Sequence, residues 1–208
     1  MRPAIVVHGI FDPAIRVAPL VRGLRARGVT RVLRARVPAL GLASVEHLAG
    51  VLGEYVARTK TELGCEKVDV VGYSMGALVT RTYLQELAGH EHVNTFVSIS
   101  GPHQGTLTAY ALPLPGVRQM RPRSALLRRL GDDVSQLTSV QVHCLYTPFD
   151  AMIVPGESGV LRGARSVHRM SVWAHHLMLQ DARVHDLVAA ILHQENARSG
   201  QTPSRTSG

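Results

Sequence analysis

The chain has 208 residues, a length typical of one domain, and 45% of them are hydrophobic, so it can bury a substantial core. Its formal net charge is +8, but the arginines are scattered, without zinc-finger spacing or an RNA-binding signature, which argues against nucleic-acid binding. Two cysteines are too few for a disulfide framework, and no apolar run is long enough to span a membrane.

Short apolar strands alternate with amphipathic helices along the chain. In chain order, the predicted elements are a strand at residues 4–7, a helix at 17–27, a strand at 31–37, a helix at 45–63, a strand at 67–71, a helix at 77–87, a strand at 93–99, short helices between 124 and 137, strands at 140–146 and 164–172, and a helix at 181–193. This alternation predicts an α/β fold with a mostly parallel central sheet covered by helices on both faces.

Residues 106–123 interrupt the alternation with three prolines, a glycine and several bulky apolar side chains. One interpretation is an irregular excursion packed on the surface; the other is a cover or wall of an apolar substrate site. The last stretch, residues 196–208, is small and polar, so we expect a disordered tail after a single domain at residues 1–195.

The stretch Gly72-Tyr73-Ser74-Met75-Gly76 matches the G-x-S-x-G pattern. A β-branched strand precedes it and a helix-compatible stretch follows it, which is the context that this pattern requires. The expected result is a sharp turn that holds the Ser74 hydroxyl at the tip of the sheet, beside the positive end of a helix. We therefore predict Ser74 to be a nucleophile.

A serine hydroxyl needs a general base, and that base needs an acid to orient it; in this architecture the chain order is serine, acid, histidine. We prefer Asp150 as the acid because it follows a predicted strand in a proline-flanked turn. Asp132 and Asp133 are alternatives near a predicted helix end, and Glu157 is another in a glycine- and serine-rich turn.

Eleven histidines compete for the role of the base. His175 and His176 lie between the last predicted strand and the last helix, where the base of this architecture belongs. We prefer His176 because it leads directly into that helix, and His175 is the alternative. His143 falls within a predicted strand. No histidine pair has a metal-ligand context, so we expect no metal and no cofactor.

An oxyanion hole requires two backbone N–H groups that face the oxygen gaining charge in the tetrahedral intermediate. Met75, directly after the nucleophile, is the first expected donor, and Ile10, in the loop after the first strand, is the second. Gly9 lets the backbone turn there. We expect His8 to brace this loop by hydrogen bonds rather than to act in catalysis.

Together with His8-Gly9-Ile10, Gly101-Pro102-His103-Gln104-Gly105-Thr106 and the contexts of Asp150 and His176, the serine motif resembles the α/β-hydrolase superfamily. Within it, the chain is similar to small bacterial triacylglycerol lipases and esterases from residue 4 to about residue 192. The resemblance implies a minimal fold without a large cap domain. It also implies a Ser74–Asp150–His176 triad that cleaves esters through an acyl-enzyme, with Ile10 and Met75 at the oxyanion hole.

Two positions depart from the family pattern. Phe11 and Ala77 stand where many of these enzymes carry a further glycine, and both narrow the space near the serine. We expect the acyl site to be lined by apolar residues from three segments, namely Phe11, Leu107, Tyr110, Leu112 and Ile153.

The expected function is that of a serine carboxylic-ester hydrolase acting on a small-molecule or lipid ester. The alternatives are acyl transfer by the same triad and a non-catalytic module that binds lipids or membranes. The scattered arginines allow weak contact with an anionic membrane surface, and the oligomeric state is left open. Without a signal peptide, we expect a cytoplasmic protein as the sequence stands, and a secreted one if a leader precedes it.

Overall fold

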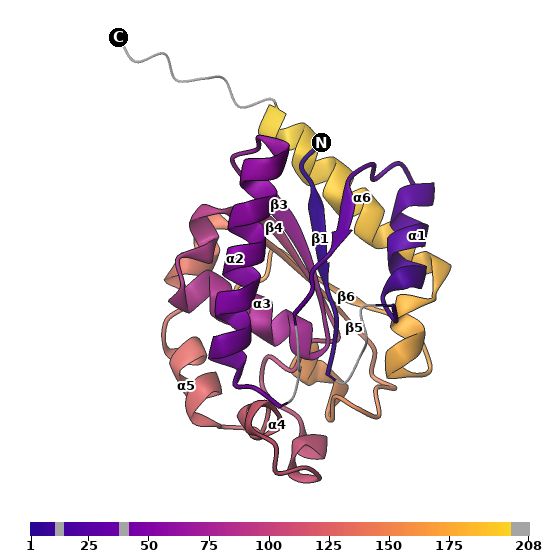
Figure 1. Cartoon of the computed structure of the whole chain (residues 1–208). Coiled ribbons are helices and arrows are strands. Elements are labelled where there is room, and N and C mark those ends of the chain that lie inside the picture. The colour runs from indigo at the N-terminus through magenta and orange to yellow at the C-terminus, as the bar shows by residue number, and fades with distance from the viewer. Residues whose placement is uncertain (11–14, 38–41, 201–208) are drawn as a thin grey trace.

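The structure is a computed structural model that describes residues 1–10, 15–37 and 42–200 (Figure 1). Its centre is a six-stranded sheet in the order β2-β1-β3-β4-β5-β6, and every pair of neighbours is parallel. The strands are β1 (Ala4–Val7), β2 (Val32–Arg34), β3 (Val68–Tyr73), β4 (Val93–Ile99), β5 (Gln141–Tyr146) and β6 (Ser166–Arg169). The predicted α/β class with a mostly parallel sheet is confirmed.

Helices cover both faces of the sheet, as Figure 1 shows, with α2 and α3 on one face and α1 and α6 on the other. The α-helices are α1 (Ala18–Ala26), α2 (Val45–Leu63), α3 (Met75–Glu86), α4 (Pro115–Gln119), α5 (Ala125–Asp132) and α6 (Ala182–Gly200). The sheet separates two apolar cores: Ile5 and Val7 of β1 pack on the α2–α3 side, and Ala4 and Val6 on the α1–α6 side. A parallel sheet buried on both faces needs such continuous apolar strands.

Local signals set the boundaries of α2 where the sequence analysis expected them. The side chain of Ser44 accepts a hydrogen bond from the backbone N–H of His47 at 3.2 Å, which caps the first turn. Gly64 ends the helix in the left-handed conformation, with φ 60°. Between these residues, the buried side chains of α2 pack into the apolar core on the α2–α3 face of the sheet.

The C-terminal helix is longer than predicted. It continues to Gly200, so residues 196–200 of the expected tail are helical, and residues 201–208 lie outside the described part. The physical reason is a long-range anchor at Asn196. Its side chain donates to Asp69 Oδ2 at 3.0 Å and accepts from the backbone N–H of Arg2 at 2.7 Å.

The segment at residues 106–123 is not wholly irregular. It contains a 3₁₀ turn, η2 (Leu107–Tyr110), and the short helix α4, neither of which the sequence predicted. Pro115 opens α4, where a missing N–H carries no penalty. The remaining 3₁₀ turns are η1 (Gly89–Glu91), η3 (Ser135–Ser139), η4 (Gly156–Gly159) and η5 (His175–Leu179).

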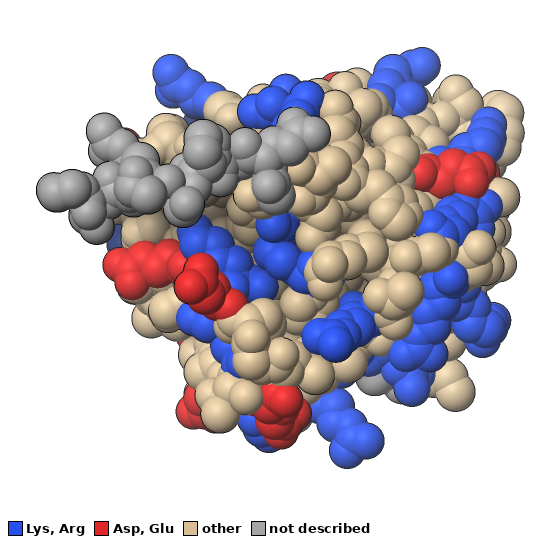
Figure 2. Space-filling view, turned by 90° about the horizontal axis from the view of Figure 1, so that it is seen from above, with Lys and Arg blue, Asp and Glu red and all other residues tan. Residues whose placement is uncertain are grey.

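The charged surface agrees with the scattered arginines of the sequence. At the end of the molecule where the strands begin, lysine and arginine side chains are spread around the face, with a few acidic groups between them (Figure 2). Within the described ranges, every helix is too short or too polar to cross a bilayer.

Replacing Asn196 by alanine should reduce the free energy of unfolding by about 1–3 kcal/mol, because buried Asp69 loses a hydrogen-bond donor. Urea denaturation measures the change. Gln194→Ala, an exposed position two residues earlier on α6, is the matched control and should leave stability nearly unchanged. Equal midpoints for both variants would contradict the anchoring role of Asn196.

Candidate active site

Ser74 lies in a sharp turn between β3 and α3. Its backbone has φ 55° and ψ −128°, and its N–H donates to Ile99 O of the neighbouring strand at 2.9 Å. A positive φ at a residue other than glycine stores strain of order 1–3 kcal/mol and persists only where the surroundings enforce it. The turn puts Ser74, which is 4% exposed, at the carboxyl edge of the sheet.

Two glycines allow the close contacts that this turn needs. A Cβ on Gly72 would lie 2.6 Å from Ala77 Cα, and a Cβ on Gly76 would lie 2.6 Å from Val7 O and overlap the carbonyl oxygen of His8. The start of α3 therefore packs directly against the end of β1. Because of this contact, the loop that carries Ile10 lies next to the first turn of α3, which begins at Met75.

His8 is buried beside this loop. Its Nδ1 lies 3.1 Å from Gly9 O, a local hydrogen bond of the kind expected for a bracing role. Phe11, the predicted substrate contact one residue after Ile10, lies outside the described residues.

Asp150 is held in a fixed orientation in the loop after β5. Its Oδ1 accepts hydrogen bonds from the backbone N–H groups of Met152 and Ile153, both at 2.9 Å, and Oδ2 accepts from His175 Nδ1 at 2.7 Å. Burial acts to raise the pKa of Asp150, but the hydrogen bond and charge of His175 and the two backbone donors outweigh it. The pKa therefore lies below the ordinary value of 3.8, and the group stays ionised at neutral pH.

The histidine bonded to Asp150 is His175, the residue that the sequence analysis ranked second. His176, the preferred candidate, is exposed to solvent, so that preference is corrected here. His175 is 9% exposed, and its ring packs on the Tyr73 ring with centroids 4.8 Å apart. Because Tyr73 directly precedes Ser74, this contact places the imidazole at the end of β3.

The physical reason for the correction is backbone direction. Ala174 is extended, with φ −154° and ψ 150°, and η5 begins at the next residue. The first side chain of that turn points inward to Asp150, and the second points to solvent. Sequence order places a histidine in this loop but does not say which of two neighbours faces the sheet.

The other acidic candidates have different surroundings. Asp133, at the end of α5, accepts hydrogen bonds from Ser135 and Gln136 and so caps the next turn. Asp132 is exposed in α5, and Glu157 lies in η4. The contact with a histidine belongs to Asp150, as predicted.

The predicted acyl-site residues fall into two groups. Leu107, Tyr110 and Leu112 are exposed on and just after η2. The side chain of Ile153 is buried, and its backbone N–H donates to Asp150 Oδ1. The segment after β4 is joined to the loop after β5, because Leu107 N–H donates to Val154 O at 2.9 Å.

Two aromatic residues that sequence reasoning missed flank the Asp150–His175 pair. Phe149 and Trp173 stack with ring centroids 4.4 Å apart, and Trp173 is 76% exposed. One signal was visible in the sequence: this chain has only one tryptophan and three phenylalanines, and two of these four residues lie within two positions of Asp150 or His175. Met152 and Leu107, whose backbone N–H groups donate to Asp150 and to Val154 O, are exposed as well, and we call these four side chains the apolar rim.

The site offers no metal centre among the residues that the structure describes, because no three histidine, cysteine or carboxylate side chains gather there or elsewhere in those ranges. Ser74, His175 and Asp150 instead provide a hydroxyl, an imidazole and a carboxylate on the loops that follow β3, β6 and β5, at one edge of the sheet.

The fold and this arrangement define an α/β-hydrolase. A family model described as palmitoyl protein thioesterase matches residues 3–149, and the chain belongs to this family. The matched region contains Ser74 and ends one residue before Asp150.

Comparison with individual proteins agrees with this assignment. The chain is 32% identical over 107 residues to the lysosomal thioesterase PPT2 homolog of Drosophila melanogaster, an alignment that covers 50% of this chain but only 36% of that relative. Lipase B of Aspergillus fumigatus has the same fold, with a TM-score of 0.79 at 19% identity over 92% of this chain and 52% of the lipase. The mature lipase BlEst2 of Bacillus licheniformis gives a TM-score of 0.76 at 12% identity, covering 92% of this chain and 91% of the lipase. The predicted superfamily is thereby confirmed.

The lowered pKa of Asp150 makes a prediction about acid stability. A depressed folded pKa contributes stability above the unfolded pKa, and this contribution is lost as the pH falls through the folded value. The stability difference between wild type and Asp150→Asn should therefore be largest at neutral pH and shrink below the ordinary value of 3.8. Urea unfolding across this range measures it; a pH-independent difference would contradict the ionised, hydrogen-bonded carboxylate.

Proposed function

We propose that this protein hydrolyses fatty-acyl thioesters and esters, with Ser74 as nucleophile, His175 as general base and Asp150 as the group that orients His175. The observation that carries the proposal is the 2.7 Å hydrogen bond between His175 and Asp150, beside the strained turn that holds Ser74. Membership in the palmitoyl protein thioesterase family supports the acyl class of substrate.

The hydrogen-bond pattern supports a defined role for each imidazole nitrogen. Ionised Asp150 only accepts hydrogen bonds, so Nδ1 of neutral His175 carries the proton and Nε2 has a free lone pair. Nε2 takes the proton of Ser74 as Oγ attacks the acyl carbon, and Asp150 stabilises the imidazolium that forms. The same nitrogen then gives this proton to the departing thiolate or alkoxide.

The oxyanion of the tetrahedral intermediate needs two donors in fixed positions. The backbone N–H groups of Met75 and Ile10 are the proposed pair, because the glycine contacts pack the start of α3 against the end of β1. Water then attacks the acyl-enzyme with His175 again as the base, which releases the fatty acid and restores Ser74.

The apolar rim favours a substrate with a long acyl chain and contact of the protein with a lipid surface. Its four side chains are exposed although they are large and apolar, and Tyr110 on η2 is exposed as well. Exposed apolar groups that gather around a polar site are typical of ligand-binding surfaces. Aromatic side chains such as the Phe149–Trp173 stack gain free energy when a chain of methylene groups covers them.

The choice of histidine gives the sharpest mutational test. His175→Ala should lower kcat for a palmitoyl thioester by a factor on the order of 10⁴ or more, because the base and its acid act as a unit. His176→Ala is the matched control, since it removes an adjacent exposed imidazole, and it should retain near wild-type kcat. Steady-state assays measure both; loss of activity in the His176 variant alone would reverse the assignment.

The apolar rim makes a prediction about chain length. Trp173→Ala should raise KM for a palmitoyl ester by roughly tenfold, which corresponds to about 1.4 kcal/mol of lost binding, and should leave KM for an acetyl ester nearly unchanged. Esters of increasing acyl length, assayed with wild type and variant, measure this. A uniform effect on all chain lengths would mean that Trp173 does not contact the acyl chain.

A further inference from the structure

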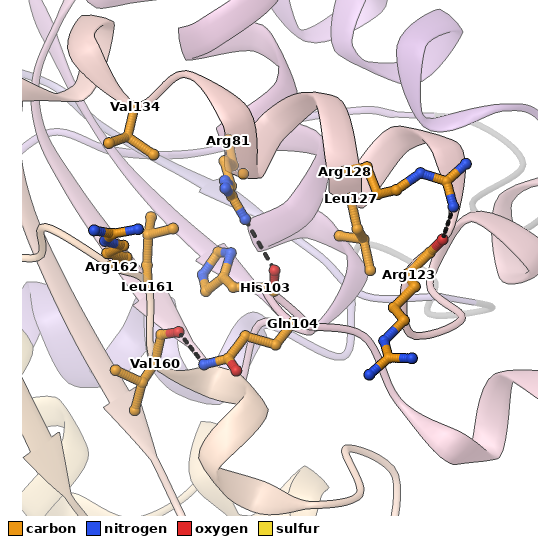
Figure 3. A pocket seen from close by; sticks show the side chains of 11 residues that line it. Arg81, His103, Gln104, Arg123, Leu127, Arg128, Val134, Val160, Leu161 and Arg162 are labelled. Carbon is orange, nitrogen blue, oxygen red and sulfur yellow. Dashed lines mark hydrogen bonds between the residues drawn. The ribbon is translucent and has the colours of Figure 1, made fainter.

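A cavity lies outside the candidate active site. It has a volume of about 380 Å³ and is enclosed by α3, α5 and the segments that follow β4 and η4 (Figure 3). Ser74, Asp150 and His175 are not among its lining residues. Four arginines line it, Arg81, Arg123, Arg128 and Arg162, and its lining includes no acidic residue.

Arg81 forms the buried part of this cavity, with 3% of its surface exposed. Its guanidinium donates to Gln85 Oε1 at 2.7 Å, to His103 O at 2.9 Å and to Leu130 O at 2.6 Å. These three acceptors are neutral. Burial lowers the pKa of Arg81 to about 10, so the side chain remains charged at neutral pH. A buried cation without a carboxylate is costly, and a bound anion would offset that cost.

His103 adds an unused polar atom to the same wall. Its ring is buried, Nε2 lies 2.7 Å from Ser98 Oγ, and Nδ1 has no hydrogen-bond partner in the described part of the chain. Burial and the charge of Arg81 hold the pKa of His103 well below its ordinary value, so the ring is neutral. In the tautomer in which Nε2 accepts from the Ser98 hydroxyl, Nδ1 carries a proton that a ligand oxygen can accept.

The rim of the cavity carries three exposed arginines, and Figure 3 shows Arg162 on one side of Arg81 and His103, with Arg123 and Arg128 on the other. Arg128 donates to the backbone carbonyl of Arg123 at 2.8 Å. The guanidinium groups of Arg123 and Arg162 have no partner within residues 1–10, 15–37 and 42–200. Arg123 also has φ 60°, a conformation that a non-glycine residue adopts only where its surroundings enforce it.

We propose that this cavity is a binding site for a phosphate-type anion, either a pyrophosphate or a phosphate monoester group. Several guanidinium groups around one space match the multiple charged oxygens of such a group, which they can bind in a bidentate manner. The volume of the cavity lies within the range of small-molecule sites and is larger than the volume that a single carboxylate group occupies. The site does not depend on the proposed hydrolysis.

Titration calorimetry of the full chain with inorganic pyrophosphate tests the site. The double variant Arg123→Gln/Arg162→Gln changes exposed side chains only and should weaken the Kd by about tenfold or more. The double variant Arg22→Gln/Arg31→Gln is the matched control, because it removes the same charge from exposed positions outside the cavity lining. It should bind pyrophosphate like wild type. Both variants should keep the urea midpoint and the esterase rate of wild type.

Vesicle sedimentation separates the two sources of the phosphate group. If phosphatidylcholine vesicles containing phosphatidic acid retain wild type but not the cavity variant, and pyrophosphate competes, the ligand is a lipid headgroup. If pyrophosphate binds with the same dependence on the cavity arginines and the vesicles do not, the ligand is a soluble phosphate compound; both results support the site. Equal weakening in the cavity and control variants, or no binding of pyrophosphate by wild type, would overturn it.

Discussion

The hydrogen bond between His175 and Asp150 connects the two loops on which the rest of the site depends. A buried carboxylate must be compensated, and here the compensation comes from His175 and from the backbone of Met152 and Ile153. These bonds fix the path of the Asp150 loop. Thr106 then ties that loop to η2, since its hydroxyl donates to Met152 O at 2.9 Å. The orientation of the imidazole and the position of the apolar rim therefore have a common structural origin.

The parallel sheet brings the proposed catalytic groups to one edge although they are far apart in sequence. Strand β3 ends at Tyr73 and β5 at Tyr146, and the loops that follow them carry Ser74 and Asp150. Because all strands run in one direction, these ends meet at one edge of the sheet. The contact between Tyr73 and His175 completes the arrangement from the loop after β6. The α/β-hydrolase fold thus positions the three loops that carry the proposed catalytic groups.

Features governed by local interactions could be predicted from the sequence. The bounds of α2 follow from Ser44 and Gly64, which act within one turn of the helix ends. The serine turn follows from Gly72 and Gly76, whose missing side chains permit close packing. The choice of Asp150 as the carboxylate that contacts a histidine came from its place after a strand in a proline-flanked turn.

Features governed by long-range contacts could not be predicted in this way. The choice of His175 over His176 depends on Asp150, which is 25 residues away in sequence. The length of α6 depends on the bond between Asn196 and Asp69, across 127 residues. The arginine cavity likewise joins α3, α5 and a loop after η4, so nothing in the spacing of its residues indicates that they meet.

In the proposed mechanism, Ser74 becomes covalently modified with His175 as its base. The most direct measurement of this modification is intact-protein and peptide mass spectrometry after treatment with a fluorophosphonate, which reacts with activated serines. One adduct per chain, located on Ser74, formed far more slowly in His175→Ala and absent in Ser74→Ala, is the predicted result. An adduct that persists in Ser74→Ala, or labelling of Ser74 at the same rate without His175, would contradict it.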